Sequence, residues 1–217
     1  MKNINKESKR NLAEEAYDVL REEIVKGSLR PNQRVVESEI SKKLGMSRTP
    51  IRDALRRLEL TGYVTTSRGG GLIVTDHTPS QIRGIYEIRE ALETMAIRLA
   101  CQRATDQQIA TVEEYHKSCA ESANQRDINR FIELNKAFHE ELYEACSNED
   151  MMSLIRLYRD QYFDRRIVRT FSNQEWRRTI KEHQSILEAI RVRSITKAQK
   201  AVSQHIRTVM RTALERL

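Results

Sequence analysis

The stretch that decides how this chain begins to fold is LGMSRTPIRDAL, residues 44–55. The amphipathic segment before it, residues 37–44, has helical spacing, so Gly45 fits the left-handed residue that ends a helix. Ser47 is a good N-cap for a following helix, and Pro50 falls in the first turn of that helix, where its missing N–H does no harm. Two helices joined by the tight turn at Gly45 predict a helix-turn-helix.

The helix that follows Ser47 carries a row of arginines. Arg48, Arg52 and Arg56 recur every four residues, whereas apolar residues such as Ile51 and Leu55 occupy another face. Arginine suits guanine edges and phosphates because its planar fork donates two parallel hydrogen bonds. An arginine row by itself is more often a solvated surface, so the neighbouring elements decide the interpretation.

Those neighbours complete a known arrangement. Residues 11–26 form an amphipathic helical pattern, and two β-prone runs, residues 63–66 and 72–75, flank the glycine-rich turn 67–71. The runs predict a hairpin with Arg68 at its tip, placed to enter a minor groove or to touch phosphate. The order of elements predicts a winged helix-turn-helix that binds double-stranded DNA.

The same residues closely resemble the GntR family of bacterial regulators over about residues 12–75. The motifs that carry the resemblance are RVVESEI (34–40), LGMSRTPIRDAL (44–55) and LELTGYV (58–64). The resemblance implies a homodimer whose operator contacts come from Arg34, Ser47, Arg48, Thr49, Arg52 and, in the wing, Arg68 and Gly69. Because this chain has Ser38 where some fatty-acid-responsive members have arginine, no base contact is expected from that position.

Composition sets wider limits. The 217 residues carry a net charge of +7, but the excess is split almost evenly about Asp76, so bulk charge does not decide the function. No apolar run reaches the roughly 20 residues of a membrane helix, and the N-terminus lacks a secretory signal. Three cysteines cannot form a disulfide framework. We therefore expect a cytoplasmic protein with no membrane partner.

The rest of the chain is expected to be all-helical. Beyond Pro79 it contains no proline and one glycine, Gly84. We therefore predict a DNA-binding domain at 1–76 and a second domain at 77–217, and a mainly α fold overall. The second domain is expected to be an antiparallel six-helix bundle with a site at its centre. Its predicted helices are 79–102, 106–123, 127–146, 149–170, 174–192 and 195–216.

Three histidines fall on the buried stripes of three different helices: His139, His183 and His205. A single buried histidine is usually a core residue with a hydrogen-bond partner, but three such residues need three partners in a bundle with few inward polar groups. A shared divalent ion would satisfy all three. His77 and His116 lack a comparable setting and are expected at the surface.

This region resembles, more weakly, the FCD effector domain of one GntR branch, the FadR subfamily. The motifs are IREALE (88–93), NKAFH (135–139), EHQSILEAI (182–190) and HI (205–206). The resemblance implies a metal held by Asn135, His139, His183 and His205. Many members have Asp where this chain has Asn135, a neutral and weaker donor. Zinc or nickel fits imidazole ligands better than manganese does.

The resemblance also implies an effector, a small carboxylate that completes the coordination of the metal and meets an arginine. Arg89 on the first bundle helix is the candidate for that arginine. The alternative for Arg89 is a surface ion pair with Glu93, four residues later.

The sequence thus predicts a homodimeric, ligand-responsive regulator, in this family most often a repressor, that binds a short inverted repeat. One alternative keeps the regulator but has the histidines line a metal-free effector pocket. A second is a metalloenzyme with three histidines and an open coordination position. The sequence offers it no general base, nucleophile elbow or phosphate loop, so we do not expect an enzyme.

Overall fold

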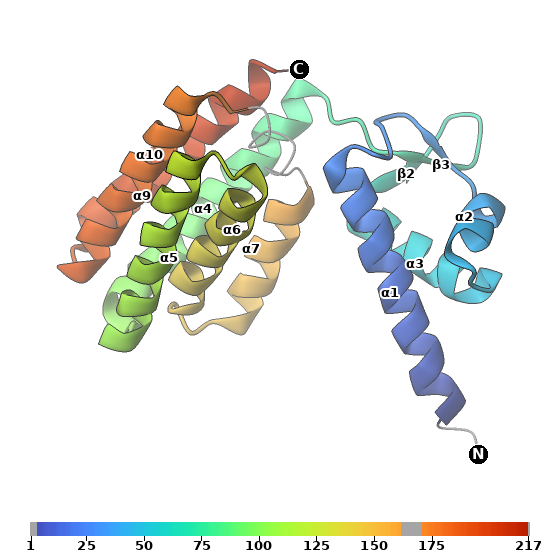
Figure 1. Ribbon diagram of the computed structural model, residues 1–217, viewed down its shortest axis with the longest axis horizontal. Coiled ribbons are helices and arrows are strands. Elements are labelled where there is room, and N and C mark those ends of the chain that lie inside the picture. The colour runs from blue at the N-terminus through green and yellow to red at the C-terminus, as the bar shows by residue number, and fades with distance from the viewer. Residues whose placement is uncertain (1–3, 162–170, 217) are drawn as a thin grey trace. The chain divides into compact units, whose positions relative to one another are not determined.

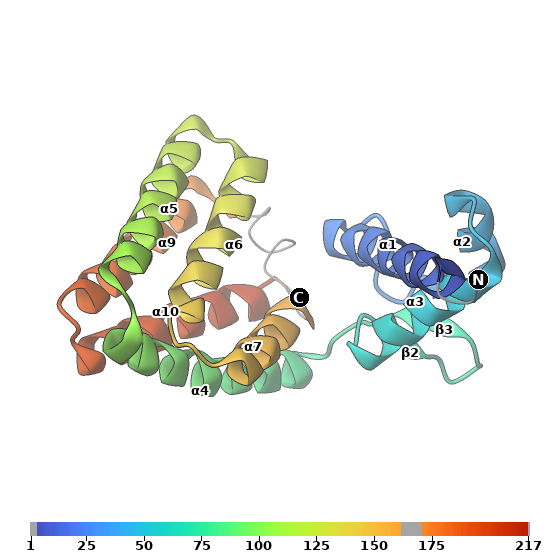
Figure 2. The same ribbon diagram turned by 90° about the horizontal axis from the view of Figure 1, so that it is seen from below.

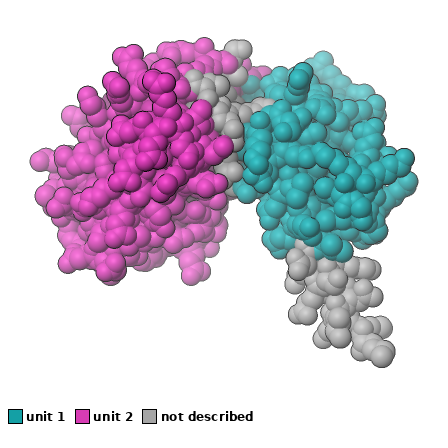
Figure 3. All heavy atoms as spheres, in the orientation of Figure 1, with its two compact units in different colours: residues 1–77 teal, residues 78–217 magenta. Residues whose placement is uncertain are grey.

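A computed structural model describes residues 4–161 and 171–216 of the chain (Figure 1). It divides into two compact units, Met1–His77 and Thr78–Leu217, which are coloured separately in Figure 3.

The first unit is a winged helix-turn-helix. Its elements are, in chain order, α1 (Ile4–Lys26), β1 (Arg34–Val35), α2 (Glu37–Leu44), α3 (Arg48–Leu60), β2 (Val64–Thr66) and β3 (Leu72–Val74). The strands form an antiparallel sheet in the order β1-β3-β2. Helices α1 and α2 both pack on α3, and Leu20, Ile51 and Leu58 are fully buried in the shared core.

The helix-turn-helix has the predicted bounds and cap. Helix α2 ends at Leu44, and Gly45 has the left-handed φ of 65° that the turn requires. Ser47 is the N-cap of α3 with an extended backbone, but its hydroxyl makes no capping hydrogen bond. The Ser47 side chain is therefore not used to hold the helix end, whereas the Ser41 hydroxyl donates to the Met46 carbonyl oxygen in the turn at 2.6 Å.

Two details of this unit differ from the sequence prediction. Helix α1 begins at Ile4 instead of residue 11, because residues 4–10 contain neither glycine nor proline but lack the apolar stripe on which the prediction rested. Strand β1 was not predicted at all. It is two residues long, with Arg34 opposite Ile73, and so short a strand shows no alternation in the sequence.

The second unit is a helical bundle (Figures 1 and 2). Its described helices are α4 (Pro79–Arg103), α5 (Asp106–Gln125), α6 (Ile128–Glu144), α7 (Glu149–Gln161), α9 (Asn173–Arg191) and α10 (Ile195–Leu214). Helix α4 packs along α10 and α7, whereas α5 packs between α6 and α9. Capping boxes begin three of the helices, at Thr78, Thr105 and Ser172.

The mainly helical architecture is as predicted, and the helix ends lie within a few residues of the expected ones. The predicted helix 149–170 is described as far as Gln161, and residues 162–170 lie outside the described part. Among the described residues, no helix combines the length and apolar character needed to cross a bilayer.

Candidate DNA-binding surface and metal centre

The residues predicted to contact DNA are all exposed on the first unit. Helix α3 buries Ile51, Leu55 and Leu58 against the core, which turns its other side to solvent. The exposed set comprises Arg34 on β1, Ser47, Arg48, Thr49 and Arg52 at the start of α3, and Arg68 and Gly69 in the wing.

Arg52 has a partner that the sequence did not indicate. Its Nε and one terminal nitrogen each donate to a different carboxylate oxygen of Glu37, at 3.3 Å. Glu37 lies at the start of α2, so the bond joins the two helices of the motif. Because both oxygens engage the same edge of the guanidinium, Glu37 restricts the directions in which Arg52 can point.

The wing places Arg34 against a glycine. Gly71 has a φ of +80°, and a Cβ built there would lie 3.2 Å from a terminal nitrogen of Arg34. A side chain at this position would therefore meet both an unfavourable backbone and the Arg34 guanidinium.

Replacing Gly71 with alanine is expected to lower the free energy of unfolding by about 1–2 kcal/mol, the usual cost of a left-handed non-glycine residue. Gly69→Ala is the matched control, since Gly69 lacks a positive φ and a Cβ there meets nothing within 4 Å. Urea denaturation followed by circular dichroism measures both variants. Equal destabilisation of the two would contradict this explanation of the wing.

The bundle brings His139 of α6, His183 of α9 and His205 of α10 together. Their ring centroids are 4.8 Å (139–183), 5.1 Å (139–205) and 5.0 Å (183–205) apart. One nitrogen from each lies within 4.8 Å of the others, and all three side chains are buried. Zn–N bonds of about 2.1 Å span at most about 4.2 Å between two nitrogens, so a shared ion would draw the rings slightly inward.

The hydrogen bonding of these histidines fits a metal. Within the described residues, neither ring nitrogen of His183 has a hydrogen-bond partner, nor does Nδ1 of His139. Burial holds the pKa values of both residues well below the ordinary value, so the imidazoles are neutral, the form that binds metal. Two neutral imidazoles with three unpaired ring nitrogens would be costly in a core unless something binds them.

The orientation of two of the rings is fixed by neighbours. Nδ1 of His205 lies 2.8 Å from a carboxylate oxygen of Glu182, which leaves Nε2 as the nitrogen that faces an ion. His183 stacks on Phe138, with centroids 4.3 Å apart and an interplanar angle of 13°. The fourth predicted ligand, Asn135, is buried on α6 one turn before His139.

One prediction about the other histidines is wrong. His116 is 7% exposed, not at the surface, and its ring centroid lies 6.2 Å from that of Phe138. Burial lowers its pKa. The acidic and basic residues around it in the sequence belong to the outer face of α5, whereas His116 is on the inner face with Val112 and Cys119. His77 is partly exposed.

Arg89 is buried in a charge cluster, so the alternative of an ion pair with Glu93 is right about the partner and wrong about the surface position. Its Nε donates to one oxygen of Glu93 at 2.8 Å, and the two side chains are 2% and 0% exposed. Arg159 of α7 donates to the other oxygen of Glu93 at 3.1 Å. Burial acts to raise the pKa of Glu93, but the two arginines hold it below the usual value. Nothing in the sequence pattern singled out Arg159.

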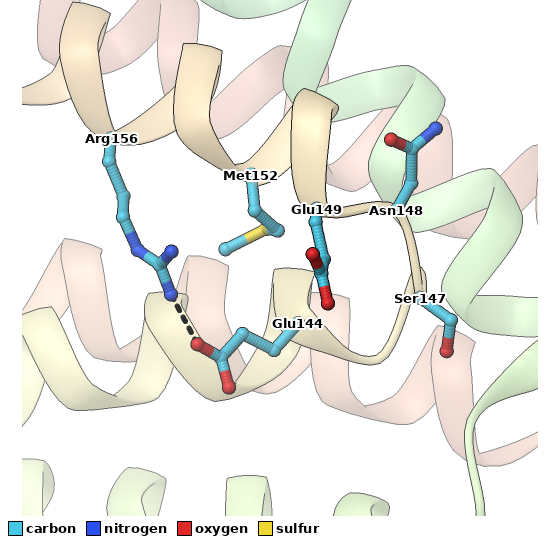
Figure 4. A pocket seen from close by; sticks show the side chains of 6 residues that line it. All are labelled: Glu144, Ser147, Asn148, Glu149, Met152 and Arg156. Carbon is cyan, nitrogen blue, oxygen red and sulfur yellow. Dashed lines mark hydrogen bonds and ion pairs between the residues drawn. The ribbon is translucent and has the colours of Figure 1, made fainter.

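A separate hollow lies at the turn between α6 and α7. It is lined by Glu144, Ser147, Asn148, Glu149, Met152 and Arg156. Figure 4 shows the ion pair between Glu144 and Arg156 at its edge. None of the three histidines lines it, and its side chains offer no metal-binding set of the kind found at His139, His183 and His205.

Comparison with known proteins yields two family matches. Residues 12–74 match the model of bacterial regulatory proteins, gntR family, and residues 84–208 match the FCD domain. An uncharacterized HTH-type transcriptional regulator, YdhC of Bacillus subtilis, is 28% identical over 88% of this chain and 84% of its own length. The Nta operon transcriptional regulator of Aminobacter aminovorans is 36% identical over 58% of this chain and 60% of its own.

A solved structure has the same fold. McbR/YncC of E. coli superposes with a TM-score of 0.81 at 21% sequence identity, covering 94% of this chain and 98% of the other. The likeness extends through both units.

Proposed function

This chain belongs to the gntR family of bacterial regulatory proteins, with an FCD domain as its second unit, and from that premise we propose that it is a homodimeric repressor controlled by a metal-linked small carboxylate. DNA binding and transcriptional regulation follow from the family. The metalloenzyme alternative is set aside, since the family and its named relatives are regulators.

The observation that carries the proposal is the meeting of three buried histidines, two of which, His139 and His183, are neutral and have ring nitrogens with no hydrogen-bond partner among the described residues. A divalent ion at His139, His183 and His205, with Asn135 as a further ligand, would satisfy them. Three neutral nitrogen ligands favour zinc or nickel. When bound, the ion supplies a Lewis-acid position at which a carboxylate oxygen can coordinate.

On the DNA side, each protomer would insert α3 into a major groove, and the wing would touch the backbone or minor groove beside it. A two-fold dimer then requires an inverted repeat. Exposed apolar residues on α4, Ile88 and Met95, each 40% exposed and two turns apart, support a surface that a second copy covers. Ligand binding in the bundle would change the spacing of the two DNA-binding units and so shift operator affinity.

The DNA-binding part is tested by electrophoretic shifts on DNA from the promoter region of its own gene. We expect salt-sensitive, sequence-selective binding there or at neighbouring promoters. Binding that is equally strong on unrelated DNA of the same length would overturn the proposed operator.

Elemental analysis distinguishes the proposed metal site from the alternative in which the histidines line a metal-free effector pocket. Protein purified without a histidine tag should carry one zinc or nickel ion per chain. If it takes up neither ion when offered them, the histidines line a metal-free effector pocket instead.

Glu182 gives a sharper prediction for the same site. Glu182→Gln is expected to weaken metal binding about 10- to 100-fold, because the carboxylate orients His205 through Nδ1 and raises its basicity. Competition with a metal-binding dye measures the affinity. Glu188→Gln, on the exposed side of the same helix, is the control. Equal affinities for the two variants would contradict the role given to Glu182.

A further inference from the structure

Arg52 differs from the other arginines of its row in having a carboxylate partner. Arg48, Arg52 and Arg56 are all exposed on α3. Among the described residues, only Arg52 of the three has a side-chain hydrogen bond or ion pair, and its partner is Glu37, the first residue of α2. Helices α2 and α3 pack against each other (Figure 1). The pair therefore joins the two helices of the motif on the surface expected to meet DNA.

The way in which Glu37 binds leaves the end of the Arg52 guanidinium available. Both bonds, from Nε and from one terminal nitrogen at 3.3 Å, lie along the side edge of the fork. A guanidinium has five N–H donors, so three remain, and they include the two parallel N–H groups at the end of the fork. Those two match O6 and N7 of guanine in the major groove. Glu37 can therefore hold Arg52 from the side while Arg52 donates both end N–H groups to one base.

The exposure of the two side chains decides where the pair has its effect. The Arg52 side chain is 72% exposed and that of Glu37 is 31% exposed, and a solvent-exposed ion pair contributes little by itself. In a major groove the same pair loses water, which strengthens the attraction between its charges. Because the carboxylate repels phosphates, the pair attracts the DNA backbone less than a lone arginine does. The pair is thus better suited to a base edge than to a phosphate.

We propose that Glu37 is a positioning residue for sequence recognition, which holds the Arg52 guanidinium from the side so that its end reads a guanine of the operator. Glu37 would contribute specificity in two ways. It removes the cost of immobilising a flexible side chain on the DNA, and it disfavours sites at which Arg52 would meet only phosphate. The inference rests on the proposed insertion of α3 into the major groove.

Glu37 also shares a structural role with a neighbour, which supplies the matched control. Glu37 and Glu39 both lie in the first turn of α2, where a carboxylate interacts favourably with the helix dipole. Glu39 is exposed and, among the described residues, has no side-chain partner. Glu39→Gln therefore removes the same charge and a similar dipole interaction but leaves Arg52 held by Glu37.

The test compares base preference in full-length wild type, Glu37→Gln and Glu39→Gln. Fluorescence anisotropy would measure the Kd on an operator selected from random DNA with the wild type, and on copies in which each G·C pair in turn is replaced with A·T. The pair whose replacement weakens the wild type but not Arg52→Ala is the one that Arg52 contacts. At that pair Glu37→Gln should lose about 2- to 10-fold of the wild-type preference, the usual cost of immobilising one flexible side chain. Glu39→Gln should keep the preference.

Binding to unrelated DNA gives a second readout. Both glutamate variants remove a negative charge, so they should bind such DNA as tightly as the wild type or more tightly. Only Glu37→Gln should lower the ratio of operator affinity to affinity for unrelated DNA. In an Arg52→Ala background, Glu37→Gln should have no further effect on base preference, because Glu37 acts through Arg52. Circular dichroism of each variant verifies that α2 remains folded.

The outcomes separate this inference from the proposed function. If the wild type selects an operator but no base pair depends on Arg52, or if Glu37→Gln keeps the full preference at the Arg52 pair, the positioning role is overturned and the operator proposal stands. If Glu37→Gln changes the preference at another base pair in the absence of Arg52, Glu37 contacts a base itself, and the positioning role is again overturned. If the wild type binds all DNA equally, both proposals fail.

Discussion

Replacing His183 with alanine is expected to reduce the bound metal from one ion per chain to almost none. The three histidines would be the strong ligands of the site, and His183 has no other partner for either ring nitrogen among the described residues. Structural zinc sites bind with apparent free energies of roughly 10–16 kcal/mol over four ligands, so losing one ligand should weaken binding by about 100-fold or more. Elemental analysis and competition with a chelator measure the content and the affinity.

His116→Ala is the matched control, because His116 is also a buried histidine packed near Phe138 but lies outside the three-histidine set. It should lose stability through the cavity it leaves and still retain the metal. Equal loss of metal in both variants would contradict the assignment of His183 as a ligand.

Replacing His183 with leucine distinguishes the loss of a metal ligand from the loss of packing in the core. His183→Leu fills much of the same space and removes two unpaired buried nitrogens, so the metal-free variant should be as stable as the metal-free wild type or more so. The metal-loaded wild type should be more stable than the variant in the presence of the same metal, since only the wild type gains binding energy. Thermal denaturation with and without zinc measures both differences.

Arg48→Ala and Arg52→Ala are each expected to weaken operator binding by about 10- to 100-fold, because a bidentate arginine–guanine contact contributes about 1–3 kcal/mol of discrimination. Both side chains are exposed at the start of α3, where a helix in the major groove presents its residues to base edges. Fluorescence anisotropy would measure the Kd on an operator selected from random DNA with the wild-type protein.

The control for these variants is Arg130→Ala, which removes the same charge from an exposed site on α6. Operator binding by Arg130→Ala should differ little from that of the wild type.

If Arg52 contacts a base, Arg52→Ala should also tolerate a substitution at one operator position that the wild type does not tolerate. An equal loss on all sequences would assign Arg52 to the phosphate backbone, and no loss would remove it from the interface.

Much of the first unit could be predicted because its signals are local. Gly45 had to be left-handed to end α2, Pro50 could only fit the first turn of α3, and the glycines at 69–71 fit a hairpin tip. The partner of Arg52 was not predictable in the same way. Glu37 lies fifteen residues earlier, and only the crossing of α2 and α3 brings the two together.

In the bundle, helical periodicity was enough to turn three histidines inward, which is why the candidate metal site was found. The charge cluster around Glu93 was not predicted, because it depends on which helices are neighbours. Arg89 and Glu93 are spaced like an ordinary surface pair, but the packing of α4 against its neighbouring helices buries them, and α7 brings in Arg159. The prediction that His116 lies at the surface failed for a related reason. The charged residues beside it in the sequence suggested an exposed segment, although His116 itself is on the inward face of α5.

The central claim is that the buried site of the bundle controls the DNA-binding unit, and one measurement tests it directly. Operator Kd would be measured by anisotropy for zinc-loaded wild type and for His183→Ala, each with and without acetate, succinate and citrate. We expect at least one acid to change the wild-type Kd by about 5- to 150-fold, the usual range of allosteric coupling, and to leave the variant unchanged. An operator affinity that no acid alters, or that changes equally in both proteins, would contradict the account.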